Sequence, residues 1–257
     1  MKEHFIVSFA PGTSGRFISG LLWVMLHNNI QHIPFTEFNS SHLYNEYKHS
    51  WDFSTALNIQ SSDIYSKFKF LAGADIGVFN SHTYPDFSSI ETHIPNSKLI
   101  IISFTETDIT EIAGNNLFKN ALPFARECIE SGITLSQNHD LSYFLRLYRV
   151  VFGTSFRGEE HSLNDDDVYK LCNAWSILIK NNYRNFINPT IPESMKEKTL
   201  VLPYKNLYTK DENNYVGLTK LAAFINRTPD KYAIDSYFRY INGRNVLLKE
   251  KLPWITS

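Results

Sequence analysis

The sequence predicts an α/β fold with a mainly parallel central sheet flanked by helices, and two observations lead to this expectation. First, four short runs near residues 5, 77, 101 and 201 are rich in apolar, β-branched and aromatic side chains, which suits buried strands. Second, stretches with helical spacing lie between these runs. Alternation of strands and helices is typical of a parallel sheet that helices cover.

The first element is a strand over residues 4–9, and a glycine-rich loop follows it directly. The loop reads Ala10-Pro11-Gly12-Thr13-Ser14-Gly15-Arg16-Phe17. Apolar residues then recur with the period of one helix face, at Ile18, Leu21, Leu22, Met25 and Leu26. A strand, a glycine-rich turn and a helix can cradle a phosphate, because glycines let backbone N–H groups converge and the helix N-terminus adds positive partial charge.

This loop departs from the P-loop of nucleotide-binding proteins at its last positions. Arg16 stands where that loop has its lysine, and it keeps a cation that can fork onto phosphate oxygens. Phe17 stands where a serine or threonine would bind magnesium, and a phenyl ring cannot do so. We therefore expect an anion site that works without a metal. A glycine-rich turn that binds nothing is the alternative.

Three further strands are expected. Residues 76–80 form the second candidate strand, which ends in Ser81-His82-Thr83-Tyr84-Pro85. Residues 99–104 are the most hydrophobic, β-branched run of the chain and predict a central parallel strand. Residues 199–204 predict a last core strand, with Pro203 near its end. Residues 30–62 are polar with weak periodicity, and they predict loops and short helices.

Helices are expected over residues 141–151, 215–226 and 230–241, and over a long segment that follows residues 164–167. The three aspartates at residues 165–167 have the appearance of a cation site. Acidic residues are, however, typical of the first turn of a helix, where they face the positive end of its dipole. We therefore interpret them as part of a helix start.

Composition narrows the class of protein. Apolar residues make up 43% and charged residues 20% of the 257 residues, as in an ordinary globular protein. The net charge is −1 and no segment concentrates lysine and arginine, so we expect no nucleic-acid partner. No apolar stretch reaches the roughly 18 residues that a membrane span needs. Cys128 and Cys172 lie in separate predicted helices, which favours free buried thiols and a cytoplasmic protein. Histidines 27, 32, 42 and 49 lack metal-ligand spacing, so we expect no metal site.

Three stretches, in order, resemble the sulfotransferase family, whose members transfer a sulfuryl group from 3′-phosphoadenosine 5′-phosphosulfate (PAPS) on a P-loop NTPase-like three-layer fold. The first is the loop over residues 10–17. The second is the strand-end sequence Asn80-Ser81-His82-Thr83-Tyr84-Pro85, followed by residues 94–104. The third is the strand and turn over residues 200–207 together with the helix over residues 221–224.

The resemblance implies a single domain over residues 1–257, with variable insertions around residues 30–65 and 120–190. It implies PAPS as the donor, no required metal, and an acceptor hydroxyl or amine. His82 would be the general base, because a histidine of near-neutral pKa can take the acceptor proton. Arg16 would act in catalysis as well as in binding. The loop residues would bind the donor: Pro11, Gly12, Thr13, Ser14, Gly15, Arg16 and Phe17.

The chain also departs from the family pattern. Thr13 stands where the family loop has a lysine, and Asn80 replaces the lysine before the histidine motif. Thr105 and Ala113 stand where the family reads the 3′-phosphate of the nucleotide. Two other functions therefore stay open. One is a catalytically inactive P-loop-like binding or assembly module. The other is a nucleotide-dependent phosphotransferase in which Glu106 would bind magnesium.

Overall fold

The computed structural model describes residues 3–26, 50–52, 76–93, 95–130, 139–157, 163–210 and 215–252. The chain divides into two compact units. The first unit consists of Met1–Thr105 and Tyr183–Gly243, and the second of Glu106–Asn182 and Arg244–Ser257.

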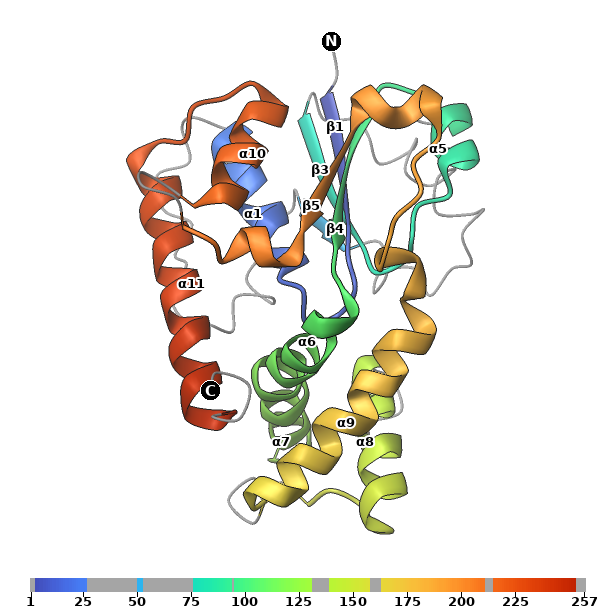
Figure 1. Cartoon of the computed structure of the whole chain (residues 1–257), viewed down its shortest axis with the longest axis vertical. Coiled ribbons are helices and arrows are strands. Elements are labelled where there is room, and N and C mark those ends of the chain that lie inside the picture. Colours follow the sequence, from blue (N-terminus) through green and yellow to red (C-terminus); the bar gives the residue numbers. More distant parts are fainter. Residues whose placement is uncertain are drawn as a thin grey trace. The chain divides into compact units, whose positions relative to one another are not determined.

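The first unit contains a parallel sheet, which confirms the α/β class and the mainly parallel sheet (Figure 1). Its strands in the described residues are β1 (Glu3–Ser8), β2 (Ser50–Asp52), β3 (Ile76–Ser81), β4 (Ser97–Ser103) and β5 (Thr199–Pro203). Their order across the sheet is β2-β3-β1-β4-β5, and every neighbouring pair is parallel. The carboxyl ends of all these strands therefore meet at one edge, where parallel α/β sheets bind their ligands.

The register fixes which loops become neighbours at that edge. Ser8, the last residue of β1, pairs with Ser81 of β3 and with Ile101 of β4. β1 thus occupies the middle of the sheet, and β4 lies beside it with Leu99, Ile100, Ile101 and Ile102 fully buried. The apolar run over residues 99–104 correctly predicted an interior strand, one place from the middle.

Two expectations about the sheet need correction. The sequence predicts loops and short helices over residues 30–62, but residues 50–52 form β2, whose three residues are too few to show a strand pattern. The other residues of that stretch lie outside the described part of the chain. The strand predicted over residues 199–204 is confirmed as β5, but its predicted place in the core is not: β5 ends the strand order of the described sheet, and only Leu202 is buried in it. Pro203 fits such an edge position because it has no N–H to donate.

Helices cover the sheet of the first unit. They are α1 (Gly15–Leu26), α5 (Phe87–His93), α10 (Val216–Ile225) and the first part of α11 (Lys231–Lys251). Figure 1 shows α1 and α10 on one side of the strands and α5 on the other. Short turns of 3₁₀-helix are η5 (Arg184–Phe186), η6 (Glu193–Lys198) and η7 (Tyr204–Leu207). The expected apolar face of α1 is confirmed, since all of its residues are buried: Ile18, Leu21, Leu22, Met25 and Leu26.

The described part of the second unit is helical. It contains η1 (Glu106–Asp108), α6 (Ile109–Asn116), the π-helical turn η2 (Leu117–Ala121), α7 (Leu122–Glu130), α8 (His139–Phe152), α9 (Asp165–Asn182) and the end of α11. At the start of α9, the Asp167 N–H donates to Asn164 Oδ1 at 3.0 Å, and the Asn164 N–H donates to Asp167 Oδ2 at 3.3 Å. This reciprocal cap confirms that the aspartates form a helix start. Asp166 is paired instead with Lys170, at 2.5 Å.

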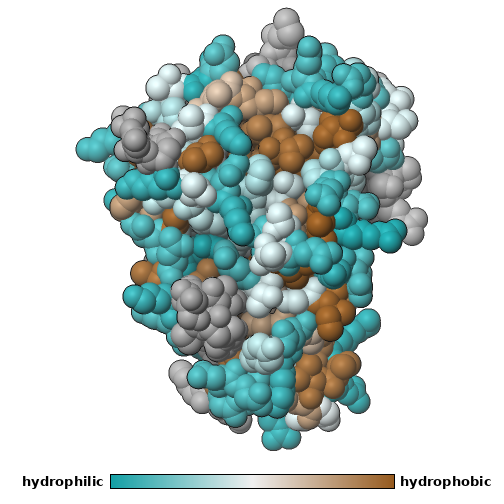
Figure 2. All heavy atoms as spheres, in the orientation of Figure 1, coloured by the Kyte–Doolittle hydropathy of each residue, from teal (hydrophilic) through white to brown (hydrophobic). Residues whose placement is uncertain are grey.

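In the residues that the structure describes, no helix is both long enough and apolar enough to cross a bilayer. On the face drawn in Figure 2, apolar side chains form separate patches among hydrophilic ones. The most exposed large apolar residues of the second unit are Val150, Ile177 and Val246, and those of the first unit are Phe238 and Ile234. Scattered exposed apolar residues of this kind are normal on protein surfaces.

Candidate functional site

The loop between β1 and α1 has a backbone suited to binding an anion. Gly12 has a φ of 87° and Ser14 a φ of 66°, whereas neither Thr13 nor Gly15 has a positive φ. A backbone in which left-handed residues alternate with others can turn N–H groups toward one point and make a concave anion site. The first N–H groups of α1 add to this site, because they have no acceptor within the helix and lie at the positive end of its dipole.

Glycine is favoured at both positions of the loop for a physical reason. Gly12 adopts a left-handed conformation that glycine reaches without steric cost. Gly15 has a negative φ but no space, because a Cβ there would lie within 3.0 Å of three atoms of the Phe9 ring. Gly15 therefore lets the start of α1 approach Phe9, which is itself buried.

The Thr13 side chain stabilises the loop from within. Its hydroxyl donates to the Ala10 carbonyl at 2.7 Å, and its backbone N–H donates to the same carbonyl at 3.2 Å. Thr13 is fully buried. The sequence assigns Thr13 to donor binding, but in this structure its hydroxyl and its backbone N–H both close the turn on the Ala10 carbonyl.

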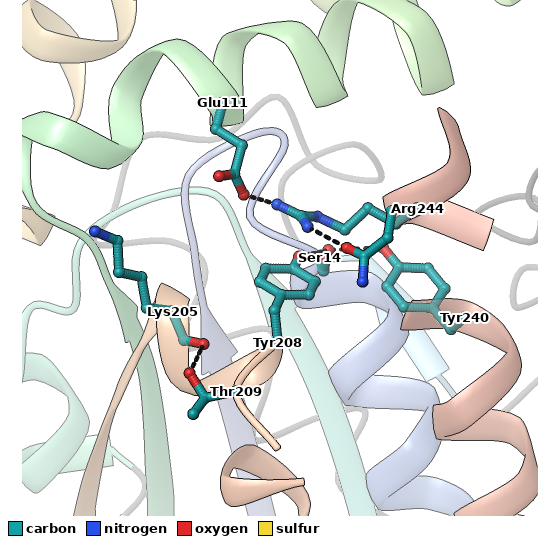
Figure 3. Close-up of polar contacts among 8 residues, drawn as sticks. Ser14, Glu111, Lys205, Tyr208, Thr209, Tyr240 and Arg244 are labelled. Carbon is teal, nitrogen blue, oxygen red and sulfur yellow. Dashed lines mark hydrogen bonds and ion pairs between the residues drawn. The ribbon is translucent and has the colours of Figure 1, made fainter. Parts of the chain in front are cut away.

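Ser14 is held by two tyrosines (Figure 3). Its Oγ lies 2.7 Å from the Tyr208 hydroxyl, and the Tyr240 hydroxyl donates to the same Oγ at 2.7 Å. Burial raises the pKa of Tyr208 well above its ordinary value and that of Tyr240 to about 12, so both phenols are neutral at physiological pH. The sequence analysis missed both tyrosines. They lie 194 and 226 residues from Ser14 along the chain, and no local pattern relates them to the loop.

Phe17 is a packing residue. Its ring stacks on that of Tyr240 with centroids 3.8 Å apart and an interplanar angle of 2°, and its exposed fraction is 4%. Tyr237 lies on the same ring at 5.6 Å and donates its hydroxyl to the Leu207 carbonyl at 2.6 Å. The Phe17 side chain thus lies in the core.

Two other predicted residues are described only in part. Arg16 lies in the first turn of α1, and its side chain lies outside the described part of the structure. Asn80 is in β3, and the same holds for its side chain. Pro11, which begins the loop, is half-buried.

His82 lies beside the loop because β1 and β3 end together. The Phe9 N–H donates to the Ser81 carbonyl at 2.9 Å, and the Ser8 hydroxyl donates to the Thr83 carbonyl at 2.5 Å. The half-buried His82 ring meets the Phe9 ring edge-on, with centroids 4.4 Å apart and an interplanar angle of 67°. The structure therefore brings the predicted general base next to the residue that leads into the predicted anion loop.

The segment after His82 is fixed by its own contacts. The Tyr84 hydroxyl donates to the Thr190 carbonyl at 3.1 Å, and burial raises the pKa of this phenol. The Tyr84 ring meets Phe186 at 5.4 Å and Phe87 at 6.0 Å, both nearly perpendicular. These contacts fix the segment over residues 82–87, which follows β3 and begins with His82.

The remaining residues named from the sequence lie as follows. Thr105 is exposed just after β4 in the first unit, and Ala113 is fully buried in α6 of the second. Glu106, the magnesium ligand of the phosphotransferase reading, is bound to Lys180 at 3.0 Å. Lys205 follows β5 at the carboxyl edge and is exposed, a cation that the sequence analysis did not consider (Figure 3).

Within the described ranges, no three histidine, cysteine, aspartate or glutamate side chains are grouped so that they could hold a metal ion. Comparison of the chain with models of protein families, with curated proteins and with solved structures gives no match. The function is therefore inferred from the geometry of the loop and its neighbours.

Proposed function

We propose that this chain is a sulfotransferase of the P-loop NTPase-like, three-layer type. It would bind PAPS at the loop over residues 11–17 and transfer the sulfuryl group to an acceptor hydroxyl or amine. One observation carries the proposal: a loop of alternating handedness, Gly12 to Gly15, lies at the carboxyl edge of a parallel sheet with His82 against the residue that leads into it. The loop that we propose to bind the anion and the histidine that we propose as general base thus lie side by side.

The reaction follows from this arrangement. The acceptor oxygen or nitrogen attacks sulfur in line, the bond between sulfur and the bridging phosphate oxygen breaks, and adenosine 3′,5′-bisphosphate (PAP) leaves. His82 accepts the proton that the acceptor loses. The negative charge on the transferring group and on the leaving phosphate would be stabilised by the loop N–H groups, which need no reorganisation during the reaction, and by the Arg16 guanidinium.

The proposal includes donor binding without magnesium. Phe17 is stacked in the core at the position of the magnesium-binding hydroxyl, so the loop supplies no metal ligand there. Glu106 forms an ion pair with Lys180. These two observations favour a metal-independent sulfuryl donor over a nucleoside triphosphate with magnesium, as the phosphotransferase reading would require.

A non-catalytic binding module is the second candidate, and a specific observation favours it. The hydroxyls of Thr13 and Ser14 are bonded to the protein itself, so the loop offers mainly backbone donors to an anion. Backbone donors are sufficient to bind a nucleotide. Without a side-chain cation close to sulfur, however, binding would not lead to transfer.

A thermal-shift panel tests the donor. PAP, PAPS, ATP and GTP are each added with magnesium or with EDTA, since a ligand that binds only the native state raises the melting temperature. We expect PAP and PAPS to raise it equally under both conditions. A shift with ATP that disappears with EDTA would favour the phosphotransferase instead.

Two substitutions separate binding from transfer. Arg16→Ala should weaken PAP binding by about 1.5–3 kcal/mol, the range for a hydrogen bond to a charged group. His82→Ala should leave PAP affinity unchanged and lower turnover by about 10²–10⁴. Arg227→Ala, at an exposed position after α10, is the matched control for Arg16→Ala. Normal PAP binding with no turnover on any acceptor would favour the binding module.

A further inference from the structure

Ser14 has a backbone conformation that serine rarely adopts. Its φ of 66° lies in the left-handed region, where a Cβ approaches the following carbonyl oxygen and where glycine is the usual residue. The alternation of handedness that turns the loop N–H groups together depends on this residue. Something outside the loop must therefore hold Ser14 in place.

The hydroxyls of Tyr208 and Tyr240 fix Ser14 by hydrogen bonds. A serine hydroxyl has one proton to donate and two lone pairs to accept. The Ser14 Oγ accepts the proton of Tyr240 and shares a second hydrogen bond with Tyr208, each at 2.7 Å. Figure 3 shows the two tyrosines reaching Ser14 from separate elements.

The tyrosines are themselves fixed. The Tyr240 ring is stacked on Phe17, which lies in the first turn of α1, three residues after Ser14. The Tyr208 ring packs against the buried Tyr204 with centroids 4.9 Å apart. Rings held in this way can keep the Ser14 hydroxyl, and with it the backbone, in one place.

We propose that Tyr208 and Tyr240 are positioning residues that hold Ser14 in its left-handed conformation and so keep the loop N–H groups directed at one anion. The inference rests on the proposed function, because it concerns the same anion site. It assigns the Ser14 hydroxyl to the protein and not to the ligand. The donor would meet only the backbone of residue 14.

This assignment predicts opposite results for two small substitutions. Glycine adopts a positive φ without help, so Ser14→Gly should bind PAP within about twofold of the wild type. Alanine keeps the steric penalty and loses both hydrogen bonds, so Ser14→Ala should weaken PAP binding about tenfold. If the Ser14 hydroxyl contacted the ligand directly, both variants would lose affinity to the same extent.

The tyrosines are tested in both backgrounds by calorimetry with PAP. Tyr208→Phe and Tyr240→Phe should each weaken binding about three- to tenfold when residue 14 is serine, the size of one hydrogen bond. When residue 14 is glycine, the same two tyrosine substitutions should change PAP affinity less than twofold, because glycine adopts the left-handed conformation without the two hydrogen bonds. Tyr237→Phe is the control: its hydroxyl bonds the Leu207 carbonyl, so it should lower the melting temperature without changing PAP affinity.

The outcomes distinguish this inference from the proposed function. Wild-type protein that does not bind PAP would overturn the proposed function and the inference with it. Wild-type binding together with equal losses in Ser14→Ala and Ser14→Gly would overturn the inference alone. So would tyrosine substitutions that weaken binding equally in both backgrounds. If Ser14→Ala does not fold, the comparison of the tyrosine variants still decides.

Discussion

Replacing Gly15 by alanine tests whether the loop depends on close approach of α1 to Phe9. The new Cβ would lie within 3.0 Å of Cγ, Cδ1 and Cδ2 of the Phe9 ring. Ordinary carbon contacts lie at about 3.5–4.0 Å, so the ring or the helix start must move by on the order of 1–2 Å. The ring has an exposed fraction of 2% and meets His82 on one edge, so it cannot turn outward without displacing that histidine.

The cost follows from these contacts. Overpacking of a buried site costs about 1–3 kcal/mol, and this site belongs at the upper end because three ring atoms are involved. Alanine recovers at most about 1 kcal/mol of helix propensity over glycine. We expect a net loss of about 2 kcal/mol, which corresponds to roughly 4–8 °C in melting temperature for a chain of this size. PAP binding should also weaken, since the loop geometry changes.

Urea denaturation of a mutant cycle measures the effect. Gly15→Ala is compared with Phe9→Leu and with the double variant, in which the smaller side chain makes room for the Cβ. We expect a favourable coupling of at least about 1 kcal/mol between the two sites. Gly153→Ala is the control, because in the part of the chain that the structure describes no atom beyond its chain neighbours lies within 4 Å of its Cβ position, and its φ of 67° makes the cost one of backbone strain.

Two results would refute this reasoning. One is a Gly15→Ala protein as stable as the wild type, which would mean that the helix start does not pack on Phe9. The other is strict additivity in the cycle, which would mean that the cost arises elsewhere.

Other predictions concern the core of each unit. Ile101→Asp places a carboxylate at a fully buried position of β4, which costs several kcal/mol and should abolish soluble expression. Val150→Asp, at a position that is 81% exposed, is the control and should stay soluble. A soluble, cooperatively folding Ile101→Asp protein would contradict the strand order. Arg244→Ala removes the buried partner of Glu111 and should lower the free energy of unfolding, measured in urea, by about 3 kcal/mol. Adding Glu111→Gln should restore most of this loss. Additive losses in the double variant would show that the two side chains are not coupled. Burial raises the pKa of the Cys172 thiol to about 12. At pH 9, iodoacetamide should therefore modify this thiol at least about a hundredfold more slowly in native than in unfolded protein, as measured by peptide mapping. Equal rates would mean that the thiol is accessible in the native protein.

The local elements of the first unit could be predicted from the sequence. Short apolar runs predicted β1, β3 and β4, and apolar residues at a period of about 3.6 residues predicted the buried face of α1. Burial of one face of an element leaves such a periodic pattern along the chain. The glycine-rich turn between β1 and α1 was also visible, since a left-handed residue and a close approach both require glycine. β2 was missed because an edge strand of three residues carries too little pattern.

The surroundings of the loop were decided by tertiary structure alone. The pairing of β1 with β3 places His82 against Phe9, although Ser8 and Thr83, which tie the two loops together, are 75 residues apart in sequence. Tyr208 and Tyr240 reach Ser14 from still greater separations, and their hydroxyls bond the side chain of a residue that the sequence predicts to bind the donor. The physical reason is the range of the forces: backbone preference and periodic burial act between near neighbours, and so leave a local pattern. Hydrogen bonds between side chains depend on which elements the packed sheet brings together, and no local pattern records that choice.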